Sequence, residues 1–314
     1  MKIIQKILKS DFLKEQPPVL IDIGASGEIN ARWKEIAPYS ICIAFDADDR
    51  EFHITEQTNK SYKKLITFNR IVTATPEDQA NFYLTHSPFC SSLLEPDTEK
   101  LKPWIFSELF KIEKTSKLPA ITIESALQQA NITYIDWFKT DTQGTDLRLF
   151  RSLPNQLKAG IMAAELEPGI LDAYKEEDKL FSVMQEMQQA GLWLSSMTVK
   201  GTQRLSSDYA GNFGAFISKR LIRTTPGWAE VTYLRNNASS LPPREILLLF
   251  IFALIEKQYG FALEIIDLAI QQHSIPLFAE CRVAVLKKMM SSRMNIPFVI
   301  LKRQINKLLS KIHD

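Results

Sequence analysis

Two short apolar runs near the start of the chain each lead into an acidic residue, at a spacing that suits an adenosyl ligand. The first run, residues 19–23, contains Asp22 and opens into a turn of small residues, Gly24-Ala25-Ser26-Gly27. The second run, residues 41–45, is followed by Asp46. In an open α/β sheet, small residues let the backbone approach a ligand, and an acid about 20 residues further on accepts the ribose hydroxyls. We therefore expect a cofactor site made of Asp22, Gly24, Ala25, Ser26, Gly27 and Asp46.

Acids on both sides of this turn distinguish between adenosyl cofactors. A pyrophosphate favours a glycine-rich turn without neighbouring acids. This turn lies between Asp22 and Glu28 and lacks the Gly-x-Gly-x-x-Gly pattern. Because carboxylates suit the ammonium and sulfonium groups of S-adenosylmethionine, we expect that cofactor rather than a dinucleotide. The simpler alternative is an ordinary strand-to-helix turn in which Ser26 caps the helix.

Composition indicates a globular protein without a strong charge preference. The 314 residues leave room for one large α/β domain and an appendage. A net charge of +2 does not favour nucleic acid, so we expect no such partner. Three separated cysteines and only four histidines argue against a disulfide framework and a histidine-rich metal centre. We expect no bound metal.

No segment is predicted to cross a membrane. The longest apolar run, residues 246–255, is about half the length that a bilayer requires. Residues 1–16 are amphipathic and lack the apolar core and cleavage site of a signal peptide. We therefore expect a cytoplasmic protein. The amphipathic terminal helices suit peripheral membrane contact or an oligomer contact, with packing inside their own bundle as the simpler alternative.

Strands and helices alternate up to about residue 220, which predicts an α/β fold with a doubly wound, mostly parallel, Rossmann-like sheet. From residue 241 the pattern is helical without strands, either as a plain bundle or with one degenerate tetratricopeptide-like unit. We expect an N-terminal helix (1–16), a cofactor-binding domain (17–225), a linker near 225–242 and a helical region (240–314). The expected strands are 18–23, 41–46, 68–73, 81–85, 135–140, 159–166, 192–199 and 214–218, with longer helices at 97–112 and 173–190.

Four blocks occur in order along the chain: residues 22–27 with Trp33, 44–48, 82–85 leading into 90–96, and 135–146, followed by the acidic stretch 164–167. Together these blocks resemble the FkbM-type S-adenosylmethionine-dependent methyltransferases, and the similarity covers residues 17–220. Glu28, Asp46 and Asp146 stand where the family usually has Gly, Glu and Glu, so the last two keep the charge. The resemblance implies a class I methyltransferase that methylates a hydroxyl on a sugar or glycan precursor.

If the chain is a methyltransferase, Asp141 is the expected catalytic group. It follows the fourth core strand, where a carboxylate acts as general base or orients the acceptor hydroxyl. The alternative is that Asp141 only caps the following helix. His86, in an inserted loop, is the second candidate base, or else a surface histidine. Ala74 and Thr75, at the end of the expected third strand, are assigned to the cofactor site.

The acceptor is expected to be a small molecule or glycan bound by Ser91, Ser92, Gln143 and Glu165. Of Glu165 and Glu167, only one is expected to face the cleft. With Asp141 these acids resemble a divalent-metal site, which the scarcity of histidines disfavours. Glu77 or Asp78 is placed near the adenine amino group, or in a solvated loop. The alternative function is a non-catalytic glycan-assembly binding module that retains the fold, and a nicotinamide oxidoreductase comes third.

Overall fold

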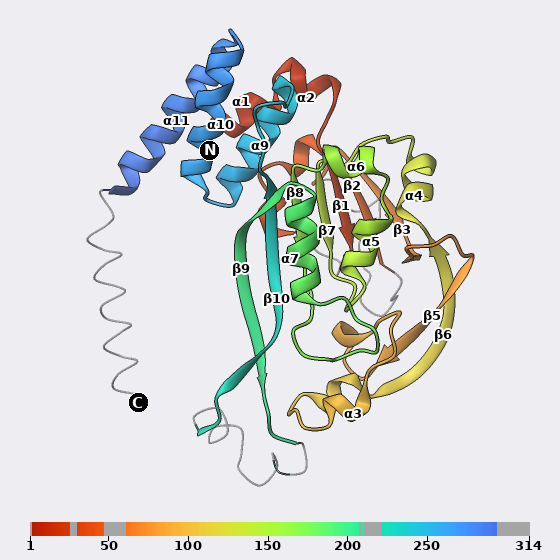
Figure 1. The fold of residues 1–314 in the computed structure, drawn as a ribbon. Coiled ribbons are helices and arrows are strands. Elements are labelled where there is room, and N and C mark those ends of the chain that lie inside the picture. Colours follow the sequence, from red (N-terminus) through yellow and green to blue (C-terminus); the bar gives the residue numbers. More distant parts are fainter. Residues whose placement is uncertain (1, 26–29, 47–60, 207–208, 210–220, 294–314) are drawn as a thin grey trace. The chain divides into compact units, whose positions relative to one another are not determined.

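The computed structural model describes residues 2–25, 30–46, 61–206, 209 and 221–293, and Figure 1 shows its ribbon. The chain forms two compact units. The larger comprises Leu8–Asn237, and the smaller joins the N-terminal residues up to Ile7 to the residues from Ala238 on. The predictions for Ser26, Gly27 and a strand at 214–218 fall outside the described residues.

The larger unit is built on a seven-stranded sheet with the order β3-β2-β1-β7-β8-β10-β9. The first five strands in this order are parallel, and β10 runs antiparallel to both of its neighbours. This arrangement confirms the predicted α/β class with a mostly parallel, Rossmann-like sheet. The chain order reverses between β1 and β7, which is where open α/β sheets bind ligands. The strands are β1 Val19–Ile23, β2 Ile41–Phe45, β3 Lys64–Phe68, β7 Trp137–Thr140, β8 Ala163–Leu166, β9 Leu192–Gln203 and β10 Thr224–Arg235.

Alternate residues of the central strands build the core of the larger unit. Val19, Ile21 and Ile23 point to one face and pack with apolar residues of α4, α5 and α7. On the other face, the ring of Trp33 meets that of Trp137 edge-on at 5.9 Å between centroids. Both faces are covered, which explains why β1 reads as a continuous apolar run. The helices are α4 Ile123–Ala130, α5 Asp146–Ser152, α6 Asn155–Gly160 and α7 Leu180–Gln189, with the 3₁₀ turns η1 Ala31–Trp33 and η2 Ala37–Tyr39.

A second sheet of three strands has the order β4-β6-β5. Its strands are β4 Ile71–Val72, β5 Gln79–Thr85 and β6 Ile112–Ile121, and the β5–β6 connection contains η3 Pro88–Cys90, α3 Thr98–Leu101 and η4 Ser107–Phe110. Two predictions are corrected here. The expected strand 68–73 is split between the two sheets, and the long helix expected at 97–112 is two short turns followed by β6. Half of the ten residues of β6 are exposed, so the strand lacks the apolar run that marks a central strand.

Two further elements differ from prediction. The helix expected from residue 173 begins only at Leu180, because residues 168–179 form an irregular loop. Residues 224–235, expected to enter a linker, form β10 instead. Pro226 and Gly227 suggested a chain break, but they lie at a β-bulge in the β9–β10 hairpin.

The remaining helices are at the two ends of the described chain. The N-terminal segment is two helices rather than one, and they are separated at Lys9 and Ser10. In the smaller unit, α10 packs against α9 and α11, and Lys6 forms an ion pair with Glu280. No described helix is both long enough and apolar enough to span a bilayer. The helices are α1 Lys2–Leu8, α2 Asp11–Glu15, α9 Pro243–Ile255, α10 Tyr259–Gln272 and α11 Pro276–Arg293.

Candidate functional site

The parallel register aligns the carboxyl ends of the central strands. The last residues of β1, β2 and β7 are paired in one row across the sheet. Gly24 directly follows β1, Asp46 follows β2, and Asp141 follows β7. Glu167 follows β8 in the same way. All four line one cavity of about 520 Å³ in the larger unit. The cavity thus lies at the edge of the sheet where this fold class binds ligands.

Gly24 makes the turn after β1 possible. Its φ is +79°, and a Cβ at this position would lie 2.1 Å from the carbonyl oxygen of Asp141. Its N–H donates to the Phe45 carbonyl over 3.0 Å, which fixes the turn against β2. Only glycine fits here. The side-chain-free backbone of Gly24 borders the cavity.

Asp46 and Arg70 bring charge to the part of the cavity beyond β2 and β3. Asp46 lines the cavity and is half-buried, in the position expected for a ribose partner. Arg70 is exposed and lies two residues beyond β3. The sequence prediction missed Arg70 because it places this residue inside a strand.

A chain of hydrogen bonds links five cavity-lining side chains. Gln143 Nε2 donates to Asp141 Oδ1 over 2.7 Å, and the Tyr174 hydroxyl lies 3.3 Å from Gln143 Oε1. On its other side, Asp141 hydrogen-bonds Glu167, which accepts a further hydrogen bond from the Trp228 indole. Gln143 adopts a left-handed φ of +56°, which turns its side chain back to Asp141. The network joins β7, β8 and β10 around one carboxyl pair.

The carboxyl pair holds a proton at neutral pH. Burial, together with the negative charge of Asp141, raises the pKa of Glu167 to about 9. Burial also raises the pKa of Asp141, although the charge of Lys139 and the hydrogen bond from Gln143 oppose the shift. Two buried carboxyls this close cannot both ionise readily. The raised pKa values therefore favour a pair in which the two carboxyls share one proton.

Asp22 is part of the support rather than of the cavity lining. It is almost completely buried, and its Oδ1 lies 2.5 Å from the Lys139 ammonium. Burial disfavours the charged form of Lys139, but the charges of Asp22 and Asp141 outweigh it and raise the pKa of the lysine. Asp22 thus keeps a cation beside Asp141.

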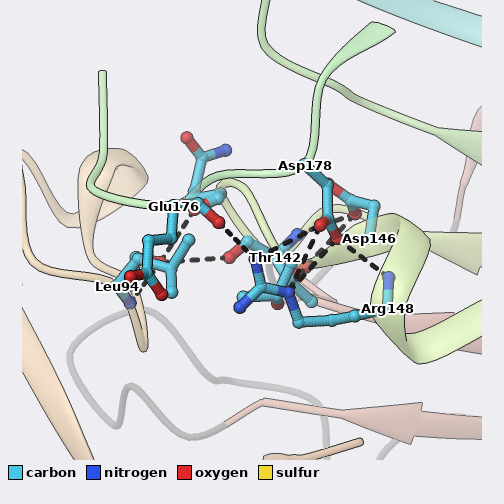
Figure 2. A network of polar contacts seen from close by, with 9 residues as sticks. Leu94, Thr142, Asp146, Arg148, Glu176 and Asp178 are labelled. Atoms are coloured by element: carbon cyan, nitrogen blue, oxygen red, sulfur yellow. Dashed lines mark hydrogen bonds and ion pairs between the residues drawn. The ribbon is translucent and has the colours of Figure 1, made fainter. Parts of the chain in front are cut away.

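Asp146 holds the turn between β7 and α5. Its Oδ1 accepts hydrogen bonds from Thr140 Oγ1 over 2.8 Å and from the Thr142 N–H over 3.2 Å. Figure 2 shows Thr142 and Asp146 side by side at the start of α5. Burial, with a smaller contribution from Asp141, raises the pKa of Asp146 to about 7. Asp146 therefore fixes the backbone that carries Asp141 and Gln143.

The loop before α7 is anchored to the same helix. The Arg148 N–H donates to Asp178 over 2.8 Å, and its guanidinium lies 3.2 Å from the same carboxylate (Figure 2). The Asp178 N–H donates in turn to the Gly144 carbonyl over 2.8 Å. These contacts hold a loop from which Tyr174 and Glu177 reach the cavity.

Aromatic side chains form another part of the lining. The rings of Phe106 and Trp228 are nearly parallel, with centroids 6.4 Å apart, and the rings of Phe110 and Tyr174 meet at 5.5 Å. Phe89 also lines the cavity and is 66% exposed. The cavity therefore combines carboxyl groups with a large aromatic surface. No sequence pattern pointed to these rings, which come from four separate segments.

Of the residues predicted to bind the acceptor, some line the cavity and others do not. Ser91 lines the cavity, and its hydroxyl accepts from the Thr85 N–H over 3.1 Å. Ser92 lies outside the lining, and its hydroxyl donates to the Gln143 carbonyl over 2.8 Å. Glu165 also lies outside, 3.6 Å from the Arg32 guanidinium. Glu165 is within β8, whereas Glu167 lies beyond its end and reaches the cavity.

Several other predicted site residues do not line the cavity. His86 is exposed and its ring nitrogen lies 2.9 Å from Glu113. Ala74 and Thr75 follow β4, a strand of the second sheet, rather than the third strand of the central sheet. Ala25 is buried, and Glu77 and Asp78 are exposed. Among the described residues, no group of three or more His, Cys, Asp or Glu side chains is arranged to hold a metal ion.

Comparison with known proteins gives no family for the chain. No protein-family model matches it, and no curated protein does.

Proposed function

We propose that the protein is an S-adenosylmethionine-dependent methyltransferase that acts on a hydroxyl group. The observation that carries the proposal is the meeting of Gly24, Asp46 and Asp141 on one cavity at the switch point of the sheet. The resemblance of the sequence blocks to FkbM-type methyltransferases supports the same conclusion.

In this proposal Gly24 and Asp46 bind the cofactor, and Asp141 acts on the acceptor. The bare backbone at Gly24 admits the cofactor, and the Asp46 carboxylate accepts hydrogen bonds from its ribose hydroxyls. When bound, S-adenosylmethionine supplies a methyl group already activated by the positive sulfur. Asp141, oriented by Gln143, accepts the proton of the acceptor hydroxyl.

The lining supports a sugar or glycan precursor as acceptor. Aromatic rings such as those of Phe106 and Trp228 pack against the C–H faces of a sugar ring. Carboxyl groups such as Glu177 accept hydrogen bonds from its hydroxyls. Both kinds of group line the same cavity.

The function is tested by mixing the protein with S-adenosylmethionine and a panel of sugars, nucleotide sugars and oligosaccharides, and by measuring S-adenosylhomocysteine. We expect turnover with at least one hydroxyl acceptor. Asp141→Asn should lower kcat by about 10²- to 10⁴-fold, the usual contribution of a general base. Asp11→Asn is the matched control, because that carboxylate is 90% exposed on α2 and lies outside the cavity.

Two results would count against this function. If the cofactor binds but no acceptor gives S-adenosylhomocysteine, the chain is better explained as a binding module that retains the fold. If Asp141→Asn turns over as fast as the unaltered protein, Asp141 is not the base.

A further inference from the structure

We propose, building on the function proposed above, that Asp141 and Glu167 act together as one base. In this proposal the pair holds one shared proton, releases it when a sulfonium ion binds beside it, and takes up the proton of the acceptor hydroxyl during transfer. Glu167 is thereby a second catalytic residue, and the charge of the cofactor controls the protonation state of the base.

The geometry places both carboxyls at the cofactor end of the cavity. Asp141 packs directly against the Gly24 turn, since a Cβ on that glycine would touch its backbone carbonyl. Glu167 hydrogen-bonds Asp141 and lines the same cavity. Gln143 and Trp228 donate to the outer sides of the two carboxyls. These donors fix the pair while leaving it open to the cavity.

The charges around the pair favour a cationic ligand. Of the described residues that line the cavity, Arg70 is the single cation, against the acids Asp46, Asp141, Glu167 and Glu177. Glu177 is already neutralised by Lys179. Farther from the cavity, Lys139 and Asp22 act on Asp141, while Asp146 and Glu230 act on Glu167. Lys139 is itself paired with Asp22, so its charge only partly offsets the negative charge of the carboxyl pair.

The titration of the pair is consistent with this role. Burial raises the pKa of Glu167 to about 9, so the pair is protonated at pH 7 when no cation is present. An opposite charge within about 4–6 Å lowers the pKa of a carboxyl by about 1–3 units. A sulfonium at that distance therefore shifts the pair toward its doubly ionised form.

The proposed step balances in atoms and charge. The bond between sulfur and the methyl carbon breaks, and its electron pair stays on sulfur. A bond forms between the acceptor oxygen and the methyl carbon, and the hydroxyl proton moves to the carboxyl pair. One positive charge leaves the sulfur and one proton arrives on Asp141 and Glu167, so the net charge of the cavity does not change.

The test needs no acceptor, because it measures protons released on cofactor binding. S-adenosylmethionine and S-adenosylhomocysteine are titrated calorimetrically at pH 7 in buffers of different ionisation enthalpy. With the pKa of the pair lowered by about 1–3 units, we expect the sulfonium ligand to release about 0.1 to 0.9 proton more than its neutral product at pH 7. Glu167→Gln should abolish this difference, and the variant comparison cancels the ionisation of the ligands themselves. Asp11→Asn is the control, since that carboxylate is 90% exposed on α2 and lies outside the cavity.

The outcomes separate this inference from the function on which it rests. Equal proton release by the two ligands in the unaltered protein overturns the shared base and leaves the cofactor assignment intact. An unchanged difference in Glu167→Gln also overturns it. If neither ligand binds, the proposed function fails, and the shared base fails with it.

A second measurement covers the case in which Glu167→Gln does not fold. The infrared spectrum of the unaltered protein at pH 7 should contain the absorption of a protonated carboxyl group. This absorption should decrease when S-adenosylmethionine is added and persist when S-adenosylhomocysteine is added. Absorption that persists with both ligands would contradict the inference.

Discussion

Among single residues of the site, Gly24 is the position that tolerates a side chain least. Its positive φ and its contact with the Asp141 carbonyl both exclude a side chain. The same contact sets the distance between the first turn and the proposed base. The geometry of one glycine therefore connects the proposed cofactor site to the proposed base.

Gly24→Ala should destabilise the protein by more than about 2 kcal/mol, because β1 and β7 must separate to admit the methyl group. Urea unfolding measures the change. Gly260→Ala is the matched control. Gly260 is in α10 with nothing within 4 Å of an added Cβ, so alanine should stabilise the helix by about 0.5–1 kcal/mol. Equal stability of Gly24→Ala and the unaltered protein would contradict the close approach.

Sequence alone locates the site residues that directly follow apolar strands. Asp46 and Asp141 are found in this way, and both line the cavity. Glu167 is recognised as an acid of the right stretch, but its neighbour Glu165 is assigned to the acceptor. Tyr174 and Trp228 carry no local signal, since a loop and a bulged strand bring them to the cavity only after the chain has folded.

At the scale of elements, burial decides which strands a sequence reveals. The central strands β1 and β2 are covered on both faces, so they appear as apolar runs with nearly the observed bounds. The strand β6 pairs on both sides but exposes half of its ten residues, and no strand is predicted there from the sequence. In β10, a bulge at Pro226 and Gly227 resembles a chain break. Of these two missed strands, β10 supplies Gly227 and Trp228 to the cavity lining, and β6 supports β5, which supplies Phe82.

The second sheet and the β9–β10 hairpin add aromatic side chains to the cavity of the Rossmann-like sheet. Phe82 of β5, Phe106 and Phe110 between β5 and β6, and Trp228 of β10 all line the cavity. The central sheet supplies the carboxyl groups, and these added elements supply the aromatic surface. We therefore expect acceptor specificity to depend on the added elements and cofactor binding on the central sheet.

At the scale of the whole molecule, buried acids make stability depend on pH. In the folded chain the pKa of Glu167 is raised from 4.5 to about 9, and that of Asp146 from 3.8 to about 7. Between these limits the folded state binds more protons than the unfolded state. The stabilising contribution of both carboxyls to the free energy of unfolding is therefore complete below about pH 4. It is lost as the pH rises through their pKa values in the folded state.

The free energy of unfolding should accordingly fall between pH 5 and pH 9, by up to about 1.4 kcal/mol per pH unit for each retained proton. Urea unfolding at each pH measures this slope. Glu167→Gln should reduce the slope, whereas Asp11→Asn should not. A stability that rises from pH 5 to pH 8 would contradict the assignment of a buried, protonated carboxyl pair.

Calorimetric titration with S-adenosylmethionine, S-adenosylhomocysteine and NAD tests most directly whether this cavity holds an adenosyl cofactor. We predict that the two sulfur ligands bind and that NAD does not. Asp46→Ala should weaken their binding by about 10- to 100-fold, since each tenfold change corresponds to about 1.4 kcal/mol and a hydrogen bond to a charged group is worth about 1.5–3 kcal/mol. Asp11→Ala should leave it unchanged. Binding of NAD alone, or equal affinity of Asp46→Ala and the unaltered protein for the sulfur ligands, would contradict the assignment.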